Sequence, residues 1–214
     1  MQIKKAVMLI SGGIDSPVAA DILLKKEVEL IYVHFDNRPL TDERPLDKVR
    51  MLIKKINAEN HKKQSKLYVI DHGKNQIEAM KKTERRYLCI LCRRMMFKTA
   101  EKIAEIEKCQ AIATGENLGQ VASQTMSNMK TITESIKIPV IRPILCNDKQ
   151  ETIDIAKTIG TYEISIMPGI CCAAVPKSPA TKSKAIIIIE EEKKINVNEL
   201  IEQAIKEAKI EYID

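Results

Sequence analysis

The feature that most constrains the fold is a short apolar run that leads directly into a glycine-rich loop near the start of the sequence. Residues 6–10 are all apolar, and the loop 11–16 that follows them reads SGGIDS. Pro17 then stands where a helix would begin, which suits proline because the first N–H groups of a helix have no partner within it. This order predicts a buried parallel strand, a tight loop and a helix.

The rest of the sequence alternates between short apolar runs and amphipathic segments of helical period. This alternation predicts an α/β fold, an open doubly wound parallel sheet with helices on both faces. Ligands bind such sheets beyond the carboxyl ends of the strands, so the loops at Ser11, His34 and Gly115 should converge there. The expected strands are 6–10, 28–35, 67–70, 111–114 and one that starts at 140. The expected helices are 17–26, 46–57, 75–82, 93–108, 121–129, 152–159 and a last helix capped by Asn198.

The composition is that of a globular protein with one core. The 214 residues suffice for one domain but not for two large ones. We expect one domain over 1–183 and a helical extension over 184–214 that packs on it. Aromatic residues make up only 3%, which predicts an aliphatic core and disfavours RNA binding by aromatic stacking. The net charge of +6 suits a polyanion such as RNA or a nucleotide, and equally a solvated basic surface.

The sequence shows no apolar segment of transmembrane length and no signal-peptide pattern at its start. We therefore expect a cytoplasmic protein without a membrane partner. In that compartment the six cysteines are more typical of metal ligands or reactive thiols than of disulfides.

The glycine-rich loop has the chemistry of a phosphate site. Gly12 and Gly13 permit a tight turn and a close approach to a ligand, and the amides at the start of the next helix attract anions. The hydroxyls of Ser11 and Ser16 can bind phosphate oxygens. Asp15 would repel phosphate unless a divalent cation lay between them, so we expect it to act with Mg²⁺. The loop is not a Walker A motif, because no Gly-Lys-Ser/Thr follows; an ordinary strand-to-helix turn is the alternative.

An SGGxDS loop after an apolar strand resembles the PP-loop of the ATP pyrophosphatases, in the adenine nucleotide alpha hydrolase-like superfamily. Further segments resemble the signatures of ThiI-type tRNA 4-thiouridine synthetases, in family order from about residue 6 to residue 183. These segments are 92–96 (CRRMM), 114–125 (TGENLGQVASQT), 142–144 (RPI), 148–149 (DK), 167–168 (MP) with Cys171, and 176–179 (PKSP). The sequence resembles a stand-alone form, without the N-terminal RNA-binding region or the rhodanese domain of larger members.

The resemblance implies an ATP site at the carboxyl edge of the sheet. Arg93 would offset charge near the phosphates, and Gly115 would allow close approach to the adenine or ribose. His34 is alternatively an ordinary strand-end histidine. Lys149, which the family needs for activity, would stabilise charge on the departing pyrophosphate, and its alternative is a solvated lysine at a helix start. The implied ATP contacts are Leu9, Ile10, Ser11, Gly12, Gly13, Asp15, Ser16, His34, Phe35, Arg93, Gly115 and Gln124.

The cysteines form a second pattern. Cys89 and Cys92 make a C-x-x-C pair just before the expected helix 93–108, and on its own this pair suits a redox site or half of a zinc site. The resemblance implies instead that Cys89, Cys92 and Cys171 hold an iron–sulfur cluster, with Cys172 as the competitor for the third position. Three thiolates would leave one iron open to bind an exogenous sulfide.

Cys171 also aligns with the position at which bacterial members carry their persulfide-forming cysteine. The implied catalytic residues are therefore Asp15, Lys149 and Cys171. Cys109 lies at a helix end and Cys146 after a strand, and we interpret both as structural.

The implied function is that of an ATP-dependent sulfurtransferase. It would adenylate uridine O4 in tRNA, release pyrophosphate, and replace the oxygen with sulfur as AMP leaves. Two alternatives stay open: the same chemistry on a small molecule such as a thiamine-pathway precursor, and a non-catalytic adenine-nucleotide-binding module with a structural metal site. The implied partners are a sulfur donor and tRNA, which this chain would bind weakly alone and more strongly as a homodimer or with an RNA-binding subunit.

Overall fold

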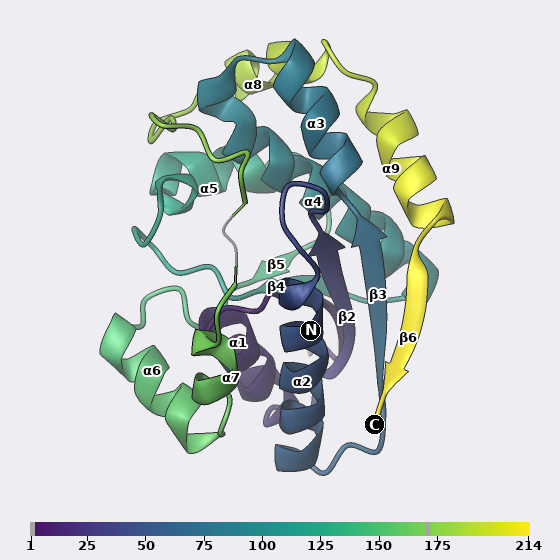
Figure 1. Cartoon of the computed structure of the whole chain (residues 1–214), viewed down its shortest axis with the longest axis vertical. Coiled ribbons are helices and arrows are strands. Elements are labelled where there is room, and N and C mark those ends of the chain that lie inside the picture. Colours follow the sequence, from purple (N-terminus) through teal and green to yellow (C-terminus); the bar gives the residue numbers. More distant parts are fainter. Residues whose placement is uncertain (1–2, 170–171) are drawn as a thin grey trace.

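A six-stranded sheet forms the centre of the computed structural model, which describes residues 3–169 and 172–214 (Figure 1). The strand order is β5-β4-β1-β2-β3-β6. Neighbours from β5 to β3 run parallel, whereas β6 pairs with β3 in the antiparallel sense. The strands are β1 (Lys5–Leu9), β2 (Glu29–Asp36), β3 (Ser65–Asp71), β4 (Ala111–Thr114), β5 (Val140–Ile141) and β6 (Lys209–Ile213).

Helices cover both faces of this sheet because each central strand is apolar on both sides. Successive side chains of a strand point to opposite faces, so Met8 packs with α1 and α2 while Val7 packs with α4. Helices α1, α2, α6 and α7 lie on one face, and α4, α5, α8 and α9 on the other. The helices are α1 (Asp15–Leu24), α2 (Arg44–Glu59), α3 (Gly73–Lys82), α4 (Leu88–Glu107), α5 (Met126–Thr133), α6 (Lys149–Thr158), α7 (Tyr162–Ile166), α8 (Ala185–Glu192) and α9 (Val197–Lys206), with short 3-10 turns at Arg85–Tyr87 and Ala122–Gln124. Within the described residues, no helix has both the length and the apolar character needed to cross a membrane.

The expected doubly wound α/β fold is confirmed, but several helix boundaries were wrong, and β6, α7 and α8 were not among the expected elements. Helix α4 begins at Leu88 rather than at residue 93, so Cys89 and Cys92 lie on its first turns and not before it. The expected helix 121–129 is a 3-10 turn followed by α5, whose first turn is capped by the Thr125 hydroxyl. The last helix is capped by Asn196, which accepts from the amide of Glu199 at 3.4 Å, and not by Asn198.

The residues of the expected extension 184–214 join the same sheet through β6 and cover α4 through α8 and α9. The contact between α4 and α8 is a buried ion pair: the Arg94 guanidinium donates to both carboxylate oxygens of Glu192, at 2.9 and 2.8 Å. Arg94 also donates to the carbonyl of Thr131 at 2.5 Å, and its side chain is only 4% exposed. The division into 1–183 and 184–214 stays a prediction.

Removing this carboxylate is expected to destabilise the fold. In Glu192→Ala, Arg94 would stay buried without its partner, so the free energy of unfolding should fall by about 3–5 kcal/mol. Urea unfolding followed by circular dichroism measures this loss. The control is Glu190→Ala on the same helix, because Glu190 is exposed and pairs only with Lys193; it should change the free energy by less than about 0.5 kcal/mol. Equal losses in the two variants would contradict the assignment.

Candidate nucleotide and sulfur site

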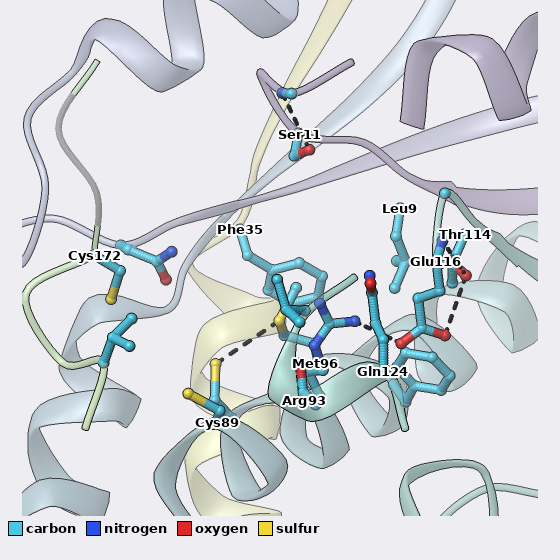
Figure 2. A pocket seen from close by; sticks show the side chains of 18 of the residues that line it. Leu9, Ser11, Phe35, Cys89, Arg93, Met96, Thr114, Glu116, Gln124 and Cys172 are labelled. Atoms are coloured by element: carbon cyan, nitrogen blue, oxygen red, sulfur yellow. Dashed lines mark hydrogen bonds and ion pairs between the residues drawn. The ribbon is translucent and has the colours of Figure 1, made fainter. Parts of the chain in front are cut away.

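A cavity of about 560 Å³ opens beyond the carboxyl ends of β1, β2 and β4 (Figure 2). This is the edge at which the loops after parallel strands meet, as expected from the topology. All of the implied ATP contacts line the cavity except Gly12 and His34. Those that line it are Leu9, Ile10, Ser11, Gly13, Asp15, Ser16, Phe35, Arg93, Gly115 and Gln124.

The glycine-rich loop is closed by its own serines. The amide of Ser11 donates to the Ser16 hydroxyl at 2.9 Å, and that hydroxyl donates back to the carbonyl of Ser11 at 3.2 Å. The residue before α1, Ile14, has no side-chain acceptor for the first N–H groups of the helix. Those N–H groups therefore remain available to an anion at the start of α1.

Gly115, which lines the cavity, also makes a close backbone contact with the start of α1. A β-carbon at position 115 would lie 2.5 Å from the backbone nitrogen of Ser16 and 2.6 Å from its α-carbon. No side chain fits there, because backbone atoms cannot swing away. Gly115 thus sets the distance between the end of β4 and the start of α1.

His34 and Gly12 do not line the cavity. The Nδ1 of His34 donates to the carbonyl of Ile10 at 3.1 Å, and burial lowers the pKa of this histidine. His34 therefore supports the end of β1, which matches its alternative interpretation as a strand-end histidine. Gly12 faces α2, where a β-carbon would lie 3.3 Å from the β-carbon of Lys48.

Asp15 is the first residue of α1, and Lys149 is the first residue of α6. Burial raises the pKa of Asp15, while the charge of Lys149 lowers it. A carboxylate in this position is stabilised by added positive charge, which fits the expected role with a divalent cation. Lys149 does not line the cavity, but it is near enough for its charge to act on Asp15. The preceding residue, Asp148, forms a capping box with Glu151 that fixes the start of α6.

Glu116 is a functional candidate that the sequence reasoning did not single out. Its carboxylate is 4% exposed and accepts from Arg93 at 2.5 Å and from Arg142 at 2.8 Å. Figure 2 shows the Arg93 side chain turned toward this carboxylate. Two guanidinium groups share one carboxylate, so the three side chains together carry a surplus positive charge, and Arg93 and Glu116 line the cavity. Such a buried anion indicates an orienting role, because it fixes both arginines.

The C-x-x-C cysteines lie at the other end of the same cavity. The sulfur of Cys92 lies 3.3 Å from Nε2 of His72 and accepts from Nε2 of Gln76 at 3.3 Å. Oε1 of the same Gln76 accepts from the thiol of Cys172 at 3.2 Å. The Gln76 amide therefore holds Cys92 and Cys172 on its two sides.

Burial makes both C-x-x-C thiols costly to deprotonate. Burial raises the pKa of Cys92 to about 12, although Arg93 opposes this, and burial also raises the pKa of Cys89. A bound metal would offset that cost by stabilising the thiolates. Across residues 3–169 and 172–214, however, no three His, Cys, Asp or Glu side chains already form a metal-binding group.

Cys171, the expected third ligand, lies outside the described residues, so the cysteine set stays a prediction. Its neighbour Cys172 lines the cavity with Cys89 and Cys92. Cys109 and Cys146 do not line it, as expected for cysteines outside the site.

A family model described as thiamine biosynthesis protein (ThiI) matches residues 2–197. The chain belongs to the ThiI family. The resemblance noted in the glycine-rich loop and in the later segments is thereby confirmed.

Relatives in the family are named probable tRNA sulfurtransferases. One from Brevibacillus brevis is 41% identical over 211 residues, which is 98% of this chain and 52% of the relative. One from Methanosarcina mazei is 37% identical over 206 residues, which is 96% of this chain and 51% of the relative. The chain thus spans about half the length of the curated relatives it matches.

Solved structures agree with the fold. A crystal structure of a 4-thiouridine synthetase–RNA complex with bound ATP superposes with a TM-score of 0.95 at 42% identity, over 99% of this chain and 55% of that one. An NMN synthetase from Francisella tularensis gives a TM-score of 0.58 at 14% identity, over 94% and 76%. The second likeness concerns the fold alone.

The tight contact at Gly115 gives a test of how the cavity is built. Gly115→Ala should lower the free energy of unfolding by about 1–3 kcal/mol, because the new methyl group meets the backbone of Ser16. Thermal or urea unfolding measures the loss. Gly169→Ala is the matched control, since a β-carbon there meets no atom within 4 Å. A Gly115→Ala variant as stable as this control would refute the packing argument.

Proposed function

We propose that this chain is an ATP-dependent sulfurtransferase that adenylates uridine O4 in tRNA and replaces that oxygen with sulfur. The observation that carries the proposal is one cavity whose wall holds both the PP-loop, at Ser11 and Asp15, and the cysteines Cys89, Cys92 and Cys172. Adenylation would occur at O4 and sulfur would attack C4, the carbon that carries this oxygen, so a catalyst needs both groups within reach of one bound base. Relatives named tRNA sulfurtransferase and the RNA complex with ATP support these substrates.

The PP-loop end of the cavity would bind the triphosphate. The free N–H groups at the start of α1 and the serine hydroxyls would hold phosphate oxygens. Mg²⁺, when bound beside Asp15, would shield the phosphate charge from that carboxylate. The Arg93–Glu116–Arg142 group would place a fixed positive charge on the opposite wall. Lys149 would act where pyrophosphate departs, because its charge already reaches Asp15.

The cysteine end would supply the sulfur. Cys89, Cys92 and Cys171 would hold an iron–sulfur cluster, with Cys172 as the competitor, and the cluster when bound would offer an open iron for exogenous sulfide. Gln76 would keep Cys92 and the 172 segment together. Sulfur would then attack C4 of the adenylated uracil, the C4–O bond would break, and AMP would leave with the oxygen.

The net charge and the family description bear on which acceptor the chain would bind. The net charge of +6 gives the chain some affinity for tRNA, which counterion release would make strongly salt-dependent. Tight binding would require further surface, from a homodimer or an RNA-binding subunit. The matched family model carries a thiamine biosynthesis description, which favours a thiamine precursor as the second candidate acceptor.

The PP-loop assignment and the acceptor are tested together. Pyrophosphate release from ATP should be stimulated by bulk tRNA and should fall by at least about a hundredfold in Asp15→Ala, because the phosphate charge loses its cation partner. The control is Asp154→Ala, because Asp154 is an exposed residue on α6 whose carboxylate accepts from Gln150. Circular dichroism verifies the fold of both variants. Full activity in Asp15→Ala would remove the PP-loop from the mechanism, and stimulation by a thiamine precursor instead of tRNA would change the acceptor.

The cysteine set is tested by metal content. After anaerobic purification, iron and sulfide should be present in the wild-type protein and should be lost in the single variants Cys89→Ala, Cys92→Ala and Cys171→Ala. Cys172→Ala decides the competition for the third position. Cys146→Ala is the control, since this cysteine is exposed and lies outside the cavity. Wild-type iron content and activity in all of the variants would refute a shared site.

A further inference from the structure

Lys48 of α2 is a buried lysine whose ammonium group is bound to backbone. Its Nζ donates to the carbonyl of Ser165 at 2.7 Å and to that of Met167 at 2.9 Å. Both carbonyls belong to the end of α7, where the last C=O groups of a helix have no partner within it. Lys48 is only 9% exposed. Its side chain therefore fixes the exit of the chain from α7.

The stem of the same lysine packs against the PP-loop. A β-carbon on Gly12 would lie 3.3 Å from Cβ and 3.4 Å from Cε of Lys48, so the methylene groups lie directly beside this glycine. A second bridge runs parallel to the first, because the hydroxyl of Ser165 donates to the carbonyl of Gly13 at 3.3 Å. The two loop glycines thus contact α2 and α7 and not only their own helix.

The segment that leaves α7 runs to the downstream cysteines. Only Met167, Pro168, Gly169 and residue 170 separate the end of α7 from Cys171 and Cys172. Cys172 lines the cavity next to the C-x-x-C pair. Lys48 therefore bonds to the base of the cysteine segment with its ammonium group and touches the phosphate loop with its stem.

The charge of Lys48 has no carboxylate partner among residues 3–169 and 172–214; its hydrogen-bond acceptors there are the two carbonyls. Burial accordingly lowers its pKa. A buried cation held only by dipoles is stabilised when an anion arrives nearby. The triphosphate expected at the PP-loop is such an anion, and it would arrive on the other side of Gly12.

We propose that Lys48 is a positioning residue that couples phosphate binding at the PP-loop to the stability of the end of α7, residues 162–169. Phosphate at the loop strengthens the hold of Lys48 on the end of α7. This inference rests on the proposed ATP site. A lysine that served only to complete α7 would stabilise the fold without responding to nucleotide.

Hydrogen exchange separates these roles. The wild-type chain is compared with and without α,β-methylene-ATP, which binds without releasing pyrophosphate. We expect the analogue to slow amide exchange by about tenfold at 162–169 as well as at 11–16, the scale of one charge-assisted hydrogen bond. Protection confined to 11–16 would overturn the coupling and leave the ATP site standing. Absence of protection at 11–16 would overturn the ATP site, and the coupling with it.

Variants then assign the effect to Lys48. Lys48→Met keeps the length of the stem but removes the charge and the donors, so the analogue should still protect 11–16 and should no longer protect 162–169. Lys54→Met on the same helix is the control, because Lys54 is exposed, and it should behave as wild type. Ser165→Ala removes the second bridge and should weaken the response at 162–169. Undiminished protection there in Lys48→Met would refute the proposal, and if that variant does not fold, the wild-type comparison and Ser165→Ala decide.

Discussion

The contact between Gly115 and the backbone of Ser16 is the constraint on which the rest of the cavity depends. It joins the end of β4 to the start of α1, and the distance is short enough that only glycine fits. The next residue, Glu116, is thereby placed where it can accept from Arg93 on α4. Because α4 also carries Cys89 and Cys92 on its first turns, the position of the phosphate loop and that of the thiols are linked through one chain of contacts.

Buried charge is the second principle of this structure. Glu116 between two arginines, Arg94 with Glu192, and Lys48 on two carbonyls each place an ion where water is largely excluded. Such groups add little net stability compared with apolar residues of similar size, but losing one partner is costly. Their effect is to specify geometry. Each fixes the spacing of two elements that are distant in the sequence.

The five parallel strands were predictable from the sequence because their signals are local, whereas the antiparallel strand β6 was not among the expected strands. A short stretch of sequence is enough to recognise each signal: the apolar runs at 6–10 and 111–114, and the SGGIDS loop between strand and helix. The start of α4 was predicted too late in the sequence, because Leu88, Ile90 and Leu91 extend the buried face of the helix before the expected start at residue 93.

The contacts around the cavity could not be predicted in this way. Lys48 lies 117 positions from Ser165, and Gln76 lies 96 positions from Cys172. Contacts between residues so far apart cannot be recognised from a single sequence. His72 and Gln76 do carry a weak signal, since they follow a parallel strand at the edge where ligands bind. Gly115 was expected to allow a close approach to the adenine or ribose. Its contact with the backbone of Ser16 could not be predicted, because only the fold brings these two segments together.

The antiparallel edge strand β6 affects folding during synthesis, because it pairs with a strand that is made much earlier. β3 comes from residues 65–71 and its outer neighbour β6 from 209–213, so Ser65 pairs with Ile213 across most of the chain. During synthesis the outer side of β3 has free N–H and C=O groups until residues 209–213 have emerged from the ribosome. An unpaired strand edge is a template for wrong pairing, and long-range pairings form late because the intervening loop must first be closed. Nascent chains stalled before residue 209 should therefore be the species that depend most on chaperones.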